Sequence, residues 1–119
     1  KTTVGTGTGA SGVYVSTTIP VTTVYQTVIS SGSDITLTST PNISTTTSVG
    51  GSTLLANGTL LIITSTAAAG VVNFQDAGTL TGSQLQLGST IRGVGQYDIL
   101  ELIFDAADQM WREVSFTNN

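Results

Sequence analysis

The chain has 119 residues, a formal net charge of −4, three basic residues, and neither histidine nor cysteine. A chain of this length forms one domain, with a core large enough to fold without disulfides. Without histidine or cysteine, the Ser/His/Asp and Cys/His arrangements of hydrolases and thiolate metal sites are excluded. Lys1, Arg92 and Arg112 are too few to neutralise several phosphates, so we expect no nucleic-acid partner.

Threonine and serine stand where a soluble domain normally carries lysine and glutamate, and only 8% of the residues are charged. This composition predicts strands that expose neutral hydroxyl groups, which is typical of a structural or binding module. No apolar stretch reaches the roughly 18 residues of a membrane span, and no signal peptide is visible, so we expect no membrane insertion. Because the first residue is lysine, we expect a processed product or a piece of a longer protein.

Residues 1–12 are rich in glycine and threonine and carry almost no apolar side chains. They predict an extended arm or linker ahead of a single β-sandwich domain at residues 13–119. The arm contains the spacing Gly7-x-Gly9-x-x-Gly12, which formally matches a dinucleotide-binding loop. Such a loop needs a strand before it and a helix after it, whereas Pro20 and β-branched residues follow here. The sequence therefore predicts no cofactor.

Short β-rich runs separated by glycine, asparagine, serine or proline begin at residue 13. Their spacing predicts an all-β fold, an antiparallel β-sandwich or a jelly-roll-like domain. In residues 34–38, Ile35 and Leu37 alternate with polar residues, which predicts a strand with these two side chains inward. Pro41 ends that strand. The other predicted strands before residue 98 lie at 13–16, 21–29, 60–63, 71–75, 85–87 and 90–92, with a turn at 76–78.

Asn57-Gly58 predicts a hairpin turn, because both residues tolerate positive φ. The continuous apolar run at 60–63 follows it and predicts a strand that is buried on both faces. A single sandwich core can use only part of this apolar surface, so the surplus needs another partner.

Residues 98–114 fit two patterns. Apolar residues recur there at helical spacing, and Asp98 with Glu101 resembles a helix-capping box. The same segment also alternates as a strand, followed by a loop at 106–109 and a return strand at 111–116. The strand pattern places on one side Leu100, Leu102 and Phe104. Periodicity leaves the helix and the hairpin open.

Residues 34–43, 72–80, 85–92, 97–104 and 111–116 together resemble a β-domain found at the C-terminal end of phage tail-fibre and related virion proteins. The resemblance implies that the last two segments are antiparallel strands joined by a short loop, with Trp111 at the start of the final strand. It also implies a homotrimer on the virion surface that serves assembly or attachment to the host. The loop Asp105-Ala-Ala-Asp-Gln109 departs from the loops of that family.

In this hairpin a four-residue loop sets Ile103 opposite Arg112 and predicts a cross-strand ion pair between Arg112 and Glu101. Such a pair explains these charges better than the enzymatic alternative, a glycosidase-like pair of carboxylates. A calcium ion held by Asp76 or Asp98 is another alternative, but the spacing of a calcium-binding loop is missing. We therefore expect a protein that is not an enzyme and that holds no metal.

Two aromatic residues receive opposite predictions. Trp111 beside Phe104 is expected in the core, whereas Tyr97, in a corner at residues 95–97, is expected to be exposed. Tyr97 is our candidate contact for a carbohydrate ligand, because its ring can stack on a sugar.

Ile99 and Ile103 share one side of the predicted strand with Glu101, and we predict that they lie in an oligomer interface. The sequence thus predicts a non-enzymatic virion structural protein, either a fibre-tip or receptor-binding domain or a capsid-decorating one. Its expected partners are copies of itself, other virion proteins or a host surface glycan. The alternative is a secreted filament subunit whose arm, from Lys1 to about Ile19, adds as a strand to the next subunit.

Overall fold

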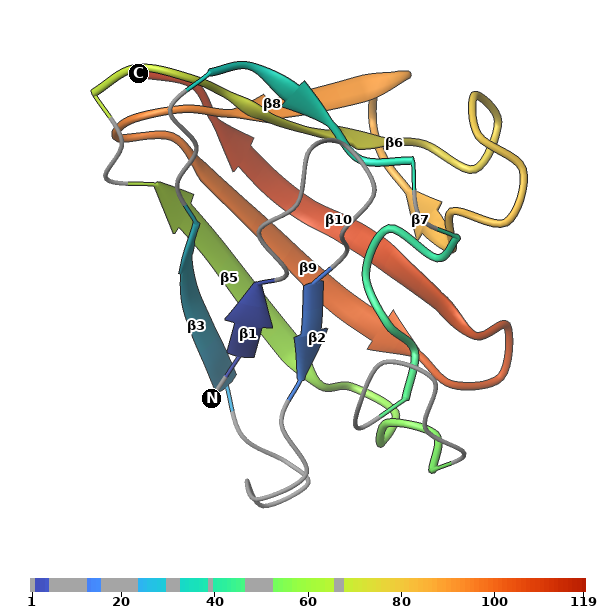
Figure 1. Ribbon diagram of the computed structural model, residues 1–119. Helices are drawn as coiled ribbons and strands as arrows, with labels where there is room; N and C mark the ends of the chain where they lie inside the picture. The colour runs from blue at the N-terminus through green and yellow to red at the C-terminus, as the bar shows by residue number, and fades with distance from the viewer. Residues whose placement is uncertain are drawn as a thin grey trace.

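The part of the chain that the computed structural model describes consists of ten β-strands with their connections and contains no helix (Figure 1). The structure describes the backbone of residues 2–4, 13–15 and 24–29, and residues 33–38, 40–46, 53–65 and 68–119 with their side chains. The strands are β1 Thr2–Val4, β2 Val13–Val15, β3 Val24–Ile29, β4 Ile35–Thr36, β5 Leu60–Ser65, β6 Val72–Gln75, β7 Leu85–Gln86, β8 Ile91–Val94, β9 Ile99–Asp105 and β10 Met110–Thr117.

Two sheets pack as the layers of a sandwich, and a two-stranded ribbon accompanies them. The larger sheet has the order β3-β5-β9-β10-β7, the smaller has the order β4-β6-β8, and β1 pairs with β2. β1 lies beside β3, and Figure 1 shows the ribbon in front of the larger sheet. The predicted all-β fold class is confirmed. Apart from β1, the predicted arm lies outside the described residues, including the glycine pattern at 7–12.

Both sheets are mixed, whereas the sequence predicts antiparallel ones. β3 runs parallel to β5, β4 to β6 and β7 to β10, while β9 is antiparallel to β5 and β10. Parallel neighbours need a long crossover connection between them. The chain supplies such crossovers because it alternates between the sheets: β6 and β8 belong to the smaller sheet, and β7 and β9 to the larger one.

Residues 98–114 form strands, which settles the choice that periodicity leaves open. β9 and β10 are an antiparallel hairpin whose turn spans residues 106–109, as the strand pattern predicts. Leu100, Leu102 and Phe104 are all buried on one side of β9. In a helix Leu100 and Phe104 would share one face and Leu102 would lie on the opposite one, whereas a strand delivers all three to one core.

The hairpin predicted at Asn57-Gly58 is wrong, although the turn itself forms, with Gly58 at a φ of 84°. Leu54, ahead of the turn, bridges to Thr46, while β5 pairs with β3 and β9. The Gly58 amide donates a hydrogen bond to the carbonyl oxygen of Phe104 at 2.8 Å, which aligns the start of β5 with β9. The local signal predicts the bend, but the partner of β5 depends on the distant strand β9.

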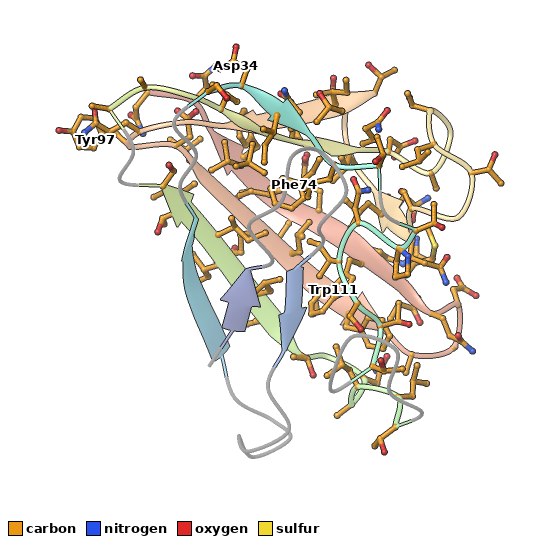
Figure 2. All side chains as sticks on the ribbon, viewed as in Figure 1. Asp34, Phe74, Tyr97 and Trp111 are labelled. Atoms are coloured by element: carbon orange, nitrogen blue, oxygen red, sulfur yellow. The ribbon has the colours of Figure 1, made fainter. Side chains whose placement is uncertain are left out.

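Alternation along the strands decides which side chains enter the core between the sheets. On β5, Leu61 and Ile63 are buried, while Leu60 and Ile62 are half-buried on the opposite side of the sheet. The burial predicted for residues 60–63 on both faces is therefore complete on one face only. Figure 2 shows two large members of the core, Phe74 and Trp111. The buried core consists of Leu37, Ile43, Leu55, Leu61, Ile63, Val72, Phe74, Leu85, Val94, Leu100, Leu102, Phe104 and Trp111.

Trp111 is fully buried, which confirms its predicted place in the core. Its ring centroid lies 5.1 Å from that of Phe104, in a tilted arrangement that aromatic pairs favour. The indole Nε1–H donates a hydrogen bond to the carbonyl oxygen of Ser44 at 3.1 Å, so the polar end of the side chain is also satisfied. The indole thereby holds segment 40–46 against the larger sheet.

An ion pair joins the two sheets at one side of the core. Arg92 of β8 contacts Glu113 of β10 through two hydrogen bonds, from Nε to Oε1 at 2.6 Å and from Nη2 to Oε2 at 2.9 Å. The Arg92 guanidinium also lies over the ring of Phe116, 4.8 Å from its centroid. Gly88 leaves room for the pair, since a Cβ there would come within 2.8 Å of Glu113 Oε2. The hydrogen bond to Glu113 raises the pKa of Arg92, so its guanidinium stays charged.

Replacing Glu113 with glutamine is expected to lower the free energy of unfolding by about 1–3 kcal/mol, because Arg92 loses its charged acceptor. The two side chains are only 23% and 13% exposed, so water compensates poorly. Urea denaturation of both proteins measures the loss. Asp108→Asn is the matched control, because Asp108 pairs with Arg112 but is 61% exposed. We expect a change below about 0.5 kcal/mol there. Equal losses in the two variants would contradict a structural role for the inter-sheet pair.

Candidate interaction surface

The side of the larger sheet that faces away from the core carries an apolar surface, which we call the outer face. The strands β4, β6 and β8 of the second layer lie on the other side of the sheet. Strand register aligns the outward residues in rows, with Ile62 beside Glu101 and Thr64 beside Ile99. The outer face consists of Leu60, Ile62, Thr64, Ile99, Glu101, Ile103, Arg112, Val114, Ser115 and Thr117.

A β-bulge in β10 shapes the outer face. The register of β10 against β9 shifts between Glu113 and Ser115, so one extra residue, Val114, is inserted there. Val114 is 51% exposed, while Phe116 packs against the core. Without the bulge, every residue after Glu113 would change sides and Phe116 would point to solvent. The bulge thus adds an apolar side chain to the outer face and keeps the core intact.

The predicted ion pair between Glu101 and Arg112 is wrong. Arg112 does lie opposite Ile103, but its guanidinium bonds to Asp105 at 3.0 Å and to Asp108 at 2.5 Å. The loop at 106–109 brings these carboxylates close, and the bulge places Glu101 beside Ser115. Glu101 is consequently half-buried between uncharged neighbours at the centre of the outer face.

The Asp105 carboxylate is expected to stabilise the fold only above its folded-state pKa. The hydrogen bond from Arg112, followed by that from the Asp108 amide, lowers the pKa of Asp105. A lowered pKa means that the folded protein binds the proton more weakly than the unfolded chain, so the contribution is present above about pH 4 and disappears as the pH falls further. Unfolding free energies of the wild type and Asp105→Asn, compared from neutral to acidic pH, should therefore converge. A constant difference would contradict this assignment.

Three carboxylates that could be considered for catalysis or calcium binding, those of Asp34, Asp76 and Asp98, accept hydrogen bonds from backbone amides. Asp76 accepts hydrogen bonds from two backbone amides at 2.7 and 2.8 Å, and Asp98 accepts two at 2.8 and 2.9 Å. Asp34 accepts one from the Val71 amide at 3.0 Å. Within the ranges whose side chains are described, no three acidic residues converge on one point that could hold a metal ion. These aspartates therefore have a structural explanation.

Tyr97 lies in the turn that connects β8 and β9 and is 70% exposed, which confirms that it is an exposed aromatic residue. Its role as a ligand contact stays a prediction. Ile99 and Ile103 lie on the outer face, and the register of β5 adds Leu60 and Ile62 to them. The apolar run at 60–63 predicts more apolar surface than one core can bury, but the sequence does not show that β9 is the strand beside it.

The fold and this surface define an all-β sandwich with one apolar sheet face. No family model matches the chain, and no curated protein or solved structure matches it. Among the described residues there is no helix long and apolar enough to span a membrane.

Proposed function

We propose that the chain is a non-enzymatic structural subunit of a virion that assembles with copies of itself, as a fibre tip or as a capsid-decorating domain. The observation that carries the proposal is the outer face, where Leu60, Ile62 and Ile103 are half-buried and Ile99 and Val114 are 39% and 51% exposed. A contiguous apolar surface on a folded domain marks an interaction site.

A second copy of the chain is the partner that suits this surface best. The centre of the outer face carries one charge, Glu101, and its only cation, Arg112, is already bound to two carboxylates. A charged partner would find little to neutralise there, whereas another neutral apolar face packs without removing many charges from water. The hydroxyls of Thr64 and Thr117 flank Ile99 at one end of the outer face, and Ser115 lies beside Glu101, so these residues suit part of a polar rim.

The assignment to a virion is supported by the resemblance to tail-fibre β-domains. In keeping with that resemblance, the last two strands form an antiparallel hairpin, and Trp111 is the second residue of β10. Several copies in one assembly would multiply weak contacts to other virion proteins or to a host surface.

Sedimentation of the purified chain at micromolar concentration tests the proposal. We expect a trimer or a larger closed assembly, and an electron micrograph of the native assembly would distinguish a fibre tip from a capsid. A monomeric sedimentation coefficient across this concentration range would contradict self-assembly.

A filament subunit is the second candidate, and the position of β3 favours it. β3 is the edge strand of the larger sheet; among the described strands it pairs only with β5, and β1 of the same chain lies beside it without pairing with it. An edge strand can accept a strand from a neighbouring subunit. Open filaments in micrographs, abolished by deletion of residues 1–19, would favour this candidate over a closed oligomer.

A further inference from the structure

The turn at residues 95–98 presents a tyrosine in a way that the fold does not require. Tyr97 has a φ of 69°, in the left-handed region that bulky residues rarely occupy, and its side chain is 70% exposed. Figure 2 shows it at one end of the molecule, pointing away from both sheets. Among the described residues with positive φ, Gly58, Gly70 and Gly82 are glycines, and the other two, Gln84 and Gln109, are glutamines, so Tyr97 is the one aromatic residue held in this conformation.

Stability alone would be served better by another residue at this position. A left-handed conformation is unfavourable for a residue with a Cβ, and a ring that stays in water gains little from burial. Residues that destabilise the local backbone and make no compensating contact are often found at functional positions. The ring of Tyr97 is therefore explained best by a ligand.

Hydrogen bonds to the backbone and to Asp98 fix the turn that carries Tyr97. Asp98 Oδ2 accepts from the Gly95 amide at 2.8 Å, and Asp98 Oδ1 accepts from the Asn119 amide at 2.9 Å. The Asn119 side chain donates to the carbonyl oxygen of Tyr97, whose own amide donates to Ser65 at 3.4 Å. A ligand would not have to order this turn, which reduces the entropic cost of binding.

The chemistry around the ring selects the class of ligand. A tyrosine ring can stack on the C–H face of a pyranose while its hydroxyl makes a hydrogen bond. Asn119 is exposed and bonds to the backbone of Tyr97, and the oxygen of its neutral side-chain amide can accept a hydrogen bond from a sugar hydroxyl. Both arginines in the described part are already in ion pairs, so no cation there is available for an acidic sugar or a phosphate.

We propose that Tyr97, with the side-chain amide of Asn119, binds a neutral hexopyranose of a surface glycan. This inference adds a ligand to the self-assembling subunit proposed above. It rests on that proposal only for avidity, because a single chain could bind the sugar without assembling. One exposed ring predicts a Kd per site on the order of 1–10 mM, which several copies in one assembly would lower by a factor of about 10² or more.

Binding is measured per chain by NMR titration of the native protein, carrying labelled tyrosine rings, with glucose, galactose, mannose and N-acetylglucosamine. We expect the Tyr97 ring signals to shift with at least one of these sugars, and not with N-acetylneuraminic acid at equal concentration. Tyr97→Gly suits the positive φ and is expected to fold, yet to bind at least about 10-fold more weakly. Tyr97→Phe keeps the ring and should lose less than about 3-fold, and Ile91→Ala, at an exposed residue of β8, should lose nothing.

The inference is overturned if none of the four sugars shifts the Tyr97 signals, if Tyr97→Gly binds as well as the wild type, or if only the acidic sugar binds. Sedimentation of the same samples separates this result from the proposed function. An assembly that forms but binds no sugar contradicts the Tyr97 site alone. A monomer whose Tyr97 still titrates contradicts self-assembly alone.

Discussion

Replacing Trp111 with alanine is expected to lower the free energy of unfolding by about 3–5 kcal/mol, the largest effect of any single substitution proposed for this chain. The indole is fully buried, lies against Phe104, and fills the space where the 40–46 segment crosses the larger sheet. Its removal leaves a cavity that the two sheets can close only in part. Because Trp111 is the only tryptophan, urea unfolding is followed by circular dichroism instead of fluorescence.

Two further variants separate the causes of this loss. Trp111→Phe keeps an aromatic ring but removes the hydrogen bond to Ser44, so we expect a smaller loss of about 1–3 kcal/mol. Val114→Ala, in the same strand but 51% exposed, should change stability by less than about 0.5 kcal/mol. If Trp111→Ala cost no more than Val114→Ala, the two sheets could not be packed around the indole.

The core of the hairpin could be predicted from the sequence because it depends on alternation within one strand. Leu100, Leu102 and Phe104 share a side in any strand, and Trp111 is the natural neighbour of Phe104 once a four-residue loop is assumed. The helical pattern also fits residues 98–114 locally. It fails because the large side chains must meet a second sheet on one side, and a single sequence does not show that requirement.

The contacts between the sheets could not be predicted, because they depend on which strand joins which sheet. Arg92 and Glu113 are 21 positions apart and meet only because β8 and β10 belong to opposite layers. Arg112 lies opposite Ile103, as a four-residue loop predicts, but its guanidinium bonds to Asp105 and not to Glu101. The extra residue Val114 shifts the register of β10 after Glu113, so that Glu101 pairs with Ser115. The sequence shows no local signal for this bulge.

In the outer face, too, part could be predicted from one strand and part depends on which strands are neighbours. Ile99 and Ile103 were predicted from alternation in β9 alone, and they do lie on the outer face. Leu60 and Ile62 join them through the pairing of β5 with β9, which connects residues about 40 positions apart. The sequence therefore predicts that some apolar side chains remain outside the core. That these side chains extend over two neighbouring strands follows from the pairing of β5 with β9.

Replacing Ile103 with glutamate is expected to weaken self-association by at least about 100-fold, since each copy would bring a carboxylate into an apolar contact while Arg112 opposite it is already bound to two other carboxylates. Ile103 lies between Leu60 and Arg112 and is half-buried in the single chain, so the substitution should leave the fold intact. Sedimentation velocity over a range of concentrations measures association, and circular dichroism monitors the fold. Thr81→Glu, at an exposed loop residue, adds the same charge and should leave association unchanged.

Glu101→Gln tests the same surface in the opposite direction. Glu101 is the one acidic residue at the centre of the outer face, and covering it with another subunit would remove its carboxylate from water. Its neutral counterpart should therefore associate more tightly, by about 10-fold if 1–2 kcal/mol of desolvation is relieved. The two substitutions differ in the sign of their charge change and lie two residues apart on β9. A general loss of packing would weaken association in both variants, whereas burial of the outer face predicts opposite shifts, so the sign of the Glu101→Gln effect separates the two explanations.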